Sequence, residues 1–496
     1  MTTGVVEETR SGRTARIAAI VFWIGLAAGL AVRVSFAFSE ALRFDSDMAV
    51  VYLMSRHVSE GEFSAFFWGQ SYGGTTLQTV AGAVMAIVGP SVPVLSIVAA
   101  LFWAGAAVIL RAIVVRSLGA VGGAVAGLLA WFPGAEIVST SVADPGFYGP
   151  SLVFGLGAIL VALHRMRERP WWSWIVLGLL AGFSLWTSPL AVAFAAPAVL
   201  AAVIADRRIG RWLVGVAAVL VAAAPWIIET VVSRLSSVKP LGGAGSLHPE
   251  SLVTLFTSMF PAAFPLGTNP VVGVLYGAVL LASIVLLVVV GVRRRDLPAL
   301  LVGSASVLLV VVLVVGTGVR LAPDSVRYSG FLIPAVAFAI AYLVTRLAGR
   351  VRLAAAAVVV ALAVAVTVVT VAREGGFTPR DGGPWDPLVV EVAELLEDRG
   401  VEAGYGAYWI AYTVTAASDE RVTLAALAPR RFPAYEEAAE GQEPAVFVVY
   451  TGHASEAALL EAPGLPEPEI VQVGGYSVLF YDEWFDPFEL EGFGAF

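Results

Sequence analysis

The chain contains no cysteine among its 496 residues, which excludes disulfide bonds, zinc–thiolate sites and thiol catalysis. It is also poor in charge, because Asp, Glu, Lys and Arg make up 14% of its residues, against about 25% in an ordinary soluble protein. Only one lysine, Lys239, is present. Together with a hydrophobic content of 58% and a mean hydropathy of +0.84, these shortages exclude a soluble globular enzyme and a disordered chain.

The few charges are divided unevenly along the chain. Residues 1–372 hold 24 basic and 15 acidic residues, whereas residues 373–496 hold 6 basic and 23 acidic ones. We therefore expect a cationic membrane domain at 1–372 and an acidic domain outside the membrane at 373–496. No basic stripe with interleaved aromatic residues occurs, so a nucleic-acid partner is not expected.

Apolar runs of about 20 residues alternate with arginine clusters, which predicts a polytopic, mainly α-helical membrane protein. The first run, Ile17–Phe38, follows Arg10, Arg13 and Arg16 and has no small-residue cleavage site after it, so we expect an uncleaved anchor and a cytoplasmic N-terminus. If all arginine clusters are cytoplasmic, the chain crosses the plasma membrane about 11 times. The other ten runs lie at about 92–110, 119–133, 148–163, 172–187, 189–205, 212–230, 270–291, 298–318, 329–345 and 353–372.

One further apolar stretch, 75–89, has two interpretations. As a full crossing it would place Arg111 and Arg116 outside the cell, against the bias of basic residues for the cytoplasm. It is short, contains several threonines and ends at Gly89-Pro90, so we favour an interfacial helix that does not cross. The first outer loop then spans 39–91, with a second, amphipathic helix expected at 48–60 in the headgroup plane, ending at Gly61.

Asp45 and Asp47 follow the first membrane helix directly. In an extended segment, residues i and i+2 face the same side, so the two carboxylates could hold a divalent cation such as Mg²⁺, Mn²⁺ or Ca²⁺. Alternatively, one carboxylate acts as a base that the other orients. A structural interpretation is also open, because Asp47 could simply cap a helix that begins at Met48.

Two other outer loops carry polar residues of interest. Asp144 precedes a proline, so it fits either a functional site or a turn or helix cap. Arg327 lies on the predicted outer side, against the positive-inside bias, where it could bind a phosphate bidentately or pair with Asp324. The four histidines are scattered, and His57 is the only one near the candidate site.

The order of these motifs resembles the GT-C superfamily of integral membrane glycosyltransferases. Within it, the chain is most similar to the bacterial group of protein O-mannosyltransferases and lipid A aminoarabinose transferases. The resemblance covers most of the chain, but Met48 stands where the family often has a glutamate after the aspartate, so Asp45 would supply the second carboxylate. The matching stretches are Phe44–Val51, Gly61-Glu62, Phe67–Gly74, Ile87–Pro90, Val142–Pro145, Arg327-Tyr328 with Pro334, and Gly404–Tyr412 with Glu420–Val422.

This resemblance implies an inverting transfer of a sugar from a polyprenyl phosphate to an acceptor hydroxyl of a protein, a lipid or a cell-envelope glycan. It implies catalytic roles for Asp45 or Asp47 as base and for Asp144 in orienting the acceptor. It also implies stabilisation of the leaving phosphate by Arg327. The other residues expected to bind substrate are Tyr328, His57, Trp68, Gln70 and Tyr72.

The acidic region 373–496 is expected to form a small α/β domain outside the cytoplasm. Helices are predicted at 387–399, 406–417 and 454–461, and strands at 421–427, 445–450 and 476–481. Two other functions stay open for the whole chain, a lipid or solute transporter and a non-catalytic scaffold of envelope assembly. The absence of a convincing internal repeat and the position of most charges at predicted helix ends favour the enzyme.

Overall fold

The computed structural model describes residues 2–42, 44–70, 72–168, 171–232, 249–316 and 321–490, with the backbone alone at 2–11, 165–168, 316, 323 and 324. Residue contacts divide the chain into two compact units. Unit 1 comprises Met1–Ala41, Ser71–Leu77 and Ser96–Pro379, and unit 2 comprises Leu42–Gln70, Gln78–Leu95 and Arg380–Phe496. Most of the first loop therefore belongs to the same unit as the C-terminal region. The domain division that the sequence predicts, at residue 372, instead groups that loop with the membrane helices.

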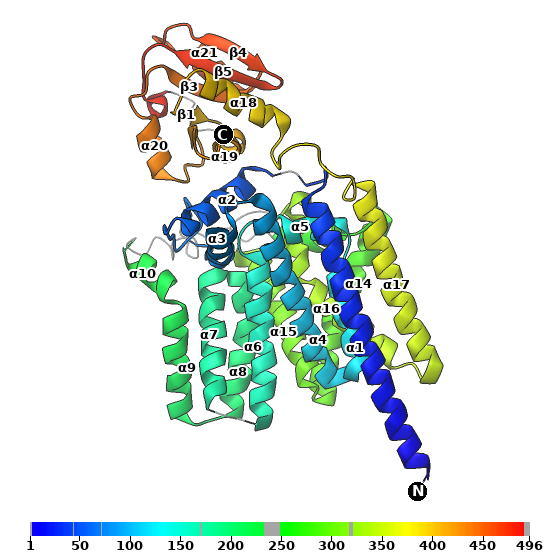
Figure 1. The fold of residues 1–496 in the computed structure, drawn as a ribbon. Helices are drawn as coiled ribbons and strands as arrows, with labels where there is room; N and C mark the ends of the chain where they lie inside the picture. The colour runs from blue at the N-terminus through cyan, green and yellow to red at the C-terminus, as the bar shows by residue number, and fades with distance from the viewer. Residues whose placement is uncertain are drawn as a thin grey trace. The chain divides into compact units, whose positions relative to one another are not determined.

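Unit 1 consists of helices that run side by side (Figure 1). Most of them are apolar along their length, and their buried residues form one continuous hydrophobic core. The helices are α1 (Thr2–Ala37), α4 (Val92–Trp131), α5 (Ala135–Val142), α6 (Tyr148–Glu168), α7 (Trp172–Thr187), α8 (Pro189–Ala205), α9 (Ile209–Ala222), α10 (Ala224–Val232), α12 (Pro249–Thr254), η1 (Leu255–Met259), α13 (Phe260–Ala262), α14 (Pro270–Arg294), α15 (Leu297–Val311), η2 (Val312–Gly316), η3 (Pro323–Phe331), α16 (Ile333–Thr345) and α17 (Gly349–Arg373).

The predicted polytopic helical class is confirmed. Among the described residues, five helices are long and apolar enough to cross a membrane. The number rises to seven if each of two bent helix pairs, α9–α10 and η3–α16, forms one span. Shorter apolar helices include α6, α7 and α8. In the described part of the chain, each of the eleven predicted runs falls on one or two helices, and residues 317 and 318 of the run 298–318 lie outside that part. The number of crossings stays a prediction.

The two predicted runs at 92–110 and 119–133 belong to α4, which is broken at Gly119. Gly119 has φ 71° and ψ −174°, a conformation that glycine adopts without steric cost. A Cβ on Gly123 would lie 2.9 Å from the carbonyl oxygen of Arg111, and one on Gly127 would lie 3.2 Å from that of Ala107. The halves of α4 therefore fold back on each other, as two separate spans would require.

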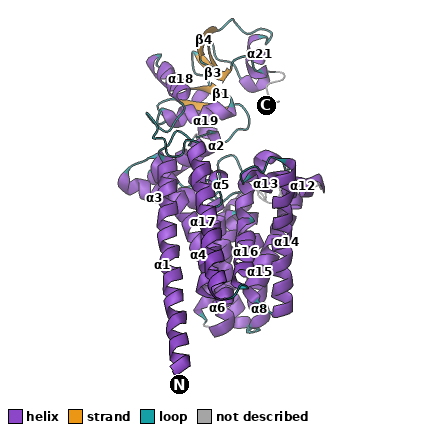
Figure 2. Ribbon diagram, turned by 90° about the vertical axis from the view of Figure 1, so that its right-hand side faces the viewer, coloured by secondary structure: helices purple, strands orange, loops and turns teal. Residues whose placement is uncertain are grey.

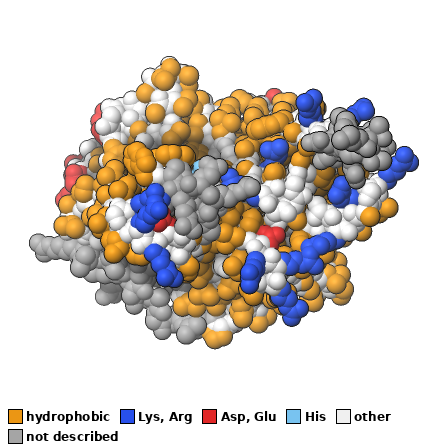
Figure 3. Space-filling model, turned by 90° about the horizontal axis from the view of Figure 1, so that it is seen from below, with side chains coloured by type: hydrophobic (Ala, Val, Ile, Leu, Met, Phe, Trp, Pro, Cys, Tyr) orange, Lys and Arg blue, Asp and Glu red, His pale blue; other side chains and the backbone are white. Residues whose placement is uncertain are grey.

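Basic side chains gather on one face of unit 1. The turns after α8, α14 and α16 carry Arg207 and Arg208, Arg295, and Arg346 respectively. Figure 3, which looks onto the end of the molecule that lies lowest in Figure 1, shows Lys and Arg side chains among hydrophobic ones. This grouping agrees with the assumption that the arginine clusters share one side of the membrane.

Unit 2 contains a five-stranded sheet together with helices from the first loop and from the C-terminal region (Figure 2). The strand order is β2-β1-β3-β5-β4, with β1 parallel to β2 and β3 and with β5 antiparallel to β3 and β4. Its elements are α2 (Ser46–Ser59), the larger part of α3 (Thr76–Val88), α18 (Pro387–Asp398), β1 (Ala403–Gly406), α19 (Tyr408–Ala417), β2 (Thr423–Ala426), α20 (Pro433–Ala439), β3 (Ala445–Tyr450), α21 (Ala454–Leu460), β4 (Glu469–Val473), β5 (Tyr476–Tyr481) and η4 (Pro487–Glu489).

The predicted helices and strands of the C-terminal region are confirmed within a few residues, but β1, β4 and α20 were not predicted. Strand β1 is hard to recognise because two of its four residues are glycines. The structure explains one of them, since a Cβ on Gly404 would lie 2.8 Å from the carbonyl oxygen of Val446 in the neighbouring β3. The close approach of the two strands therefore excludes the β-branched side chains that usually mark a strand.

The two helices of the first loop are present near their predicted positions. α2 ends before Gly61, whose φ is 99°, and its residues Met48–Ser55 are all buried. α19 packs on α2, and a Cβ on Gly82 of α3 would lie 2.5 Å from the carbonyl oxygen of Ser55. At 13 residues, α3 is about 20 Å long, short of the roughly 30 Å of a hydrocarbon core, which favours the interfacial interpretation.

The absence of native cysteine allows the predicted orientation to be tested by labelling single cysteines. Glu467→Cys in unit 2 and Arg207→Cys in the α8–α9 turn are both at exposed positions. A membrane-impermeant maleimide added to intact cells is expected to label the first variant and not the second. Equal labelling of both variants after the membrane is opened is the control, and labelling of Arg207→Cys in intact cells would contradict the orientation.

Candidate functional site

Asp45 and Asp47 take different positions at the start of α2. Helix α2 begins at Ser46, so the extended geometry expected for this pair is wrong. Asp45 is the N-cap residue, and its Oδ1 accepts a hydrogen bond of 3.0 Å from the amide of Met48. The capping interpretation therefore applies to Asp45, while Asp47 projects from the first turn of the helix.

The carboxylate of Asp47 is held by two residues of the C-terminal region. The hydroxyl of Tyr408 donates a hydrogen bond to Asp47 Oδ1, and the same oxygen lies 3.6 Å from Nη2 of Arg431. Arg431 Nη2 also donates to the Tyr408 hydroxyl at 3.1 Å. In addition, the Ser46 hydroxyl donates to the carbonyl oxygen of Tyr408, which joins α2 to the start of α19 through a second contact.

A second cluster lies around Glu420, in the turn between α19 and β2. Glu420 Oε1 accepts hydrogen bonds from the hydroxyl of Tyr435 at 2.5 Å and from Nε2 of His57 at 2.8 Å, while its Oε2 lies 3.4 Å from Nε of Arg56. Nδ1 of His57 lies 2.7 Å from Glu62 Oε2. Because carboxylates are the partners of both ring nitrogens, both must donate, and His57 is the charged imidazolium.

This pairing shifts the pKa of both partners. Burial lowers the pKa of His57, but its hydrogen bonds to Glu420 and Glu62 outweigh burial and raise the pKa above its usual range. Burial raises the pKa of Glu420, but hydrogen bonds from His57 and Tyr435 outweigh it and leave the pKa below its usual range. Both shifts favour the charged forms of the pair, and the hydrogen bonds fasten the end of α2 to the C-terminal region.

Trp68 and Gln70, both predicted to bind substrate, lie in the segment that follows α2. Trp68 is buried and stacks on Phe432 with ring centroids 3.9 Å apart, and its Nε1 donates to Ser64 Oγ at 3.1 Å. These contacts favour a packing role for Trp68. Gln70 is half-buried, and its Oε1 is a buried acceptor without a hydrogen-bond partner.

Asp144 is fully buried in unit 1, in the turn between α5 and α6. Its Oδ1 accepts from the amides of Gly146 and Tyr148, both at 3.0 Å, and its Oδ2 accepts from the amide of Gly149 at 2.6 Å and from Trp103 Nε1 at 3.1 Å. Three of these donors belong to the first turn of α6 or to the residues before it. The geometry thus favours the cap interpretation for Asp144.

Arg33 of α1 helps to fix the helix that precedes this turn. It is buried, its guanidinium carbon lies 3.4 Å from the centroid of Trp131, and its Nε donates to Ser141 Oγ in α5 at 2.8 Å. α5 is therefore tied to both α1 and α4. The sequence gives no signal for this role beyond the presence of an arginine inside an apolar run.

The other predicted residues of unit 1 lie in η3 and in the segment before α3. Tyr328 shares a side-chain hydrogen bond with Tyr148, and their ring centroids lie 5.7 Å apart, which brings Tyr328 beside the Asp144 turn. The side chain of Arg327 is exposed, with its guanidinium carbon 5.7 Å from the Tyr328 ring. The alternative partner of Arg327, the side chain of Asp324, lies outside the described residues. Tyr72 is 45% exposed.

The residues around Asp45 and Asp47 do not fit a divalent cation in this arrangement. One oxygen of Asp45 is engaged in the helix cap, and Asp47 faces a guanidinium, which repels a cation. In the part of the chain that the structure describes, no three His, Cys, Asp or Glu side chains converge as metal ligands. A metal requirement stays a prediction, and no chemical step is derived from it.

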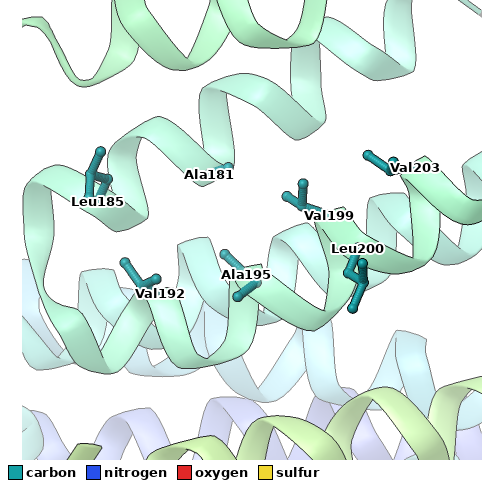
Figure 4. A pocket seen from close by; sticks show the side chains of 8 residues that line it. Ala181, Leu185, Val192, Ala195, Val199, Leu200 and Val203 are labelled. Carbon is teal, nitrogen blue, oxygen red and sulfur yellow. The ribbon is translucent and has the colours of Figure 1, made fainter. Parts of the chain in front are cut away.

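A cavity of about 430 Å³ opens between α7 and α8 in unit 1 (Figure 4). Its lining is entirely aliphatic: Ala181, Leu185, Val192, Ala195, Ala196, Val199, Leu200 and Val203. Without a polar group it can accommodate hydrocarbon but offers no catalytic chemistry. The cavity is therefore not the candidate active site.

The sequence patterns do not single out four side chains that contact Asp47 or Glu420 or belong to that cluster: Tyr408, Glu420, Arg431 and Tyr435. Tyr408 and Glu420 lie in stretches that carry the family resemblance, but no role was assigned to them. Arg431 has a weak signal, because it is one of only 6 basic residues among the 23 acidic ones of its region. Tyr408 contacts Asp47, and Glu420 contacts His57, each across more than 300 positions of the chain. A local sequence pattern cannot reveal such contacts.

No family model and no curated protein matches the chain by sequence. Solved structures do match. ArnT from Cupriavidus metallidurans in the apo state gives a TM-score of 0.59 at 16% identity, over 93% of this chain and 98% of that one. The same protein bound to undecaprenyl phosphate gives 0.58 at 14% identity, over 95% and 98%.

The Archaeoglobus fulgidus oligosaccharyltransferase, in a complex with Zn and sulfate, gives a TM-score of 0.52 at 12% identity. The match covers 92% of this chain and 73% of that one. At these identities the comparisons show the fold, which this chain shares with ArnT and with the archaeal oligosaccharyltransferase. The fold expected from the family resemblance is therefore confirmed.

The His57–Glu420 pair predicts how stability depends on pH. A raised histidine pKa stabilises the fold fully below about pH 6.5, and this contribution is lost as the pH rises through the folded-state pKa. We expect the unfolding temperature of the wild type to fall between about pH 6 and pH 9 more steeply than that of His57→Gln, as measured by tryptophan fluorescence.

The lowered pKa of Glu420 acts in the opposite pH range, because its contribution to stability is present above about pH 4.3 and is lost as the pH falls.

The matched control for His57→Gln is Glu397→Gln, which removes a surface pair with Arg421. It should keep the wild-type slope above pH 6, and an unchanged slope in His57→Gln would contradict the assignment.

For Asp144 we expect a loss of stability when the carboxylate is removed. Asp144→Ala leaves four donors without an acceptor in a buried turn, which should cost about 2–4 kcal/mol in the free energy of unfolding. Glu136→Gln, in the neighbouring and exposed part of α5, is the control and should change it little. An Asp144→Ala protein as stable as the wild type would show that the hydrogen bonds do not support the turn.

Proposed function

We propose that the protein is a membrane glycosyltransferase, which moves a sugar from a polyprenyl-phosphate donor to an acceptor hydroxyl. The observation that carries this proposal is the fold shared with ArnT over 93% of this chain and 98% of that one. ArnT has been captured with undecaprenyl phosphate, which supports a polyprenyl-linked donor for this chain as well. The acceptor is a protein, a lipid or a cell-envelope glycan.

In this reaction Asp47 is the base. The acceptor oxygen attacks the anomeric carbon of the donor and loses its proton to the Asp47 carboxylate, while the bond between that carbon and the phosphate oxygen breaks. The polyprenyl phosphate leaves with the electron pair, and attack from the opposite face inverts the anomeric configuration. Asp47 is better suited than Asp45 to act as the base, because one carboxylate oxygen of Asp45 is used to cap α2.

Arg327 stabilises the negative charge of the leaving phosphate. Its side chain is exposed at η3, and a guanidinium binds phosphate oxygens through two parallel hydrogen bonds. Tyr328, Tyr72 and Gln70 are proposed to contact the substrates. We assign His57, Trp68 and Asp144 to supporting the site, since each is engaged in the contacts described above.

The reaction is proposed to occur on the outer side of the plasma membrane. Support comes from the arginine-rich turns of unit 1, which the positive-inside bias places in the cytoplasm together with the N-terminus. The C-terminal region then lies outside the cytoplasm. No nucleotide-binding fold is needed, because the activated sugar arrives on the lipid.

The test is sugar transfer or donor hydrolysis by the purified protein with a panel of undecaprenyl-phosphate sugars. Asp47→Asn is expected to lower the rate by about 100-fold or more, since it removes the base. Arg327→Ala should lower it by about 10- to 100-fold through lost charge stabilisation. Asp45→Asn is the matched control, because asparagine still caps a helix and should leave the rate within about threefold.

Each variant is compared with the wild type for its unfolding temperature, so that loss of activity is not confused with loss of fold. Reactions with EDTA, and with Mg²⁺ or Mn²⁺ added back, test the predicted metal requirement. If the donors bind equally well to the wild type and to Asp47→Asn without any turnover, the enzyme assignment fails. The transporter and scaffold interpretations would then take its place.

A further inference from the structure

Asp47 lies 361 positions from Tyr408 in the sequence, yet the two side chains share a hydrogen bond inside unit 2. The side chain of Arg431 is only 12% exposed and that of Asp47 only 20%, so their ion pair is largely shielded from water. Shielding strengthens such contacts relative to a surface ion pair. Tyr408 and Arg431 both reach Oδ1, so together they fix the rotation of the carboxylate.

Arg431 is itself held firmly in place. A Cβ on Gly69, whose φ is 67°, would lie 2.6 Å from the carbonyl oxygen of Arg430 and 2.6 Å from the Cα of Arg431. The first loop and the 430–431 backbone therefore touch without room for a side chain. The backbone amides of Arg431 and Phe432 donate hydrogen bonds to the hydroxyl oxygen of Tyr412, which adds a second restraint.

The guanidinium of Arg431 also lies over two aromatic rings. Its central carbon is 5.1 Å from the ring centroid of Tyr408 and 5.3 Å from that of Phe67. With these neighbours the guanidinium of Arg431 has little conformational freedom, so it can hold Asp47 in one position. The arrangement therefore has the properties of a preorganised support for a catalytic group.

We propose that Tyr408 and Arg431 are positioning residues, which hold the Asp47 carboxylate in the orientation in which it accepts the proton of the acceptor hydroxyl. This inference rests on the proposed function, and it gives the C-terminal region a part in the chemistry itself. Tyr408 and Arg431 do not bind substrate in this account. They act through Asp47, so their loss slows turnover more than it weakens substrate binding.

The contact can be measured without any substrate. Burial raises the pKa of Tyr408 well above its usual range, the charge of Asp47 raises it further, and the charge of Arg431 lowers it. A polyfluorinated tyrosine at position 408, whose phenol ionises at a lower pH than that of tyrosine, brings this titration into a range where the protein stays folded. Its ionisation is followed by fluorine NMR on the full chain.

Two variants should shift this titration in opposite directions. Asp47→Asn is expected to lower the midpoint by about one pH unit or more, because a negative neighbour is removed, and Arg431→Met to raise it. Arg430→Met is the matched control, since Arg430 pairs with Glu436 instead. A midpoint that does not move in Asp47→Asn would overturn the inference, because the contact would not exist.

The catalytic part is tested by transfer from undecaprenyl-phosphate sugars with unmodified Tyr408. Tyr408→Phe and Arg431→Met should each lower kcat by about 10-fold or more with KM within about twofold, as expected when a base loses its orientation. Arg431→Lys should recover part of the rate, and Arg430→Met should match the wild type. Fluorine shifts with an unchanged kcat in Tyr408→Phe and Arg431→Met would overturn the positioning role.

The two parts of the experiment separate this inference from the proposed function. A wild-type protein that transfers no sugar from any donor overturns the proposed function and the positioning role that rests on it, even if the fluorine midpoints shift as expected. Turnover that depends on Asp47 but not on Tyr408 or Arg431 overturns the inference alone. Turnover that depends on all three, together with opposite fluorine shifts, supports both.

Discussion

The pairing of two half-buried carboxylates, Asp47 and Glu420, is the constraint on which unit 2 depends. A charge that is removed from water must be paired, and each of these has its partners across the junction between the first loop and the C-terminal region. Asp47, at the beginning of α2, contacts Tyr408 and Arg431. Glu420 contacts Arg56 and His57 near the end of the same helix. α2 is therefore fastened at both ends.

This arrangement explains how so short a loop helix can hold Asp47, the proposed base, in a fixed position. α2 has 14 residues, and an isolated helix of that length is only marginally stable in water. Here α2 packs against α19 and α3. The stacking of Trp68 on Phe432 holds the segment that follows α2 in place. Unit 1 supplies its own turn around Asp144 by the same means, with three backbone amides of that turn and the indole of Trp103 donating to one buried carboxylate.

Hydropathy and arginine placement predict the helices of unit 1 well, because burial in a membrane leaves a strong and local signal. The break of α4 at Gly119 and the α2–α3 pair follow from the same local features. The roles of individual aspartates do not follow from local features. The helix begins two residues earlier than predicted, which makes Asp45 the cap instead of Asp47. The partners of Asp47 and Glu420 also escape local patterns, because the chain brings them together from the other end of the sequence.

The most direct test of the central claim is an experimental map of the protein in lipid nanodiscs with undecaprenyl phosphate bound. We expect phosphate density within hydrogen-bond distance of the Arg327 guanidinium, with the isoprenoid chain along the apolar surface of unit 1. A phosphate bound elsewhere in unit 1, with Arg327 in water, would contradict the assignment of the donor site. A failure of undecaprenyl phosphate to bind at all would contradict the glycosyltransferase itself.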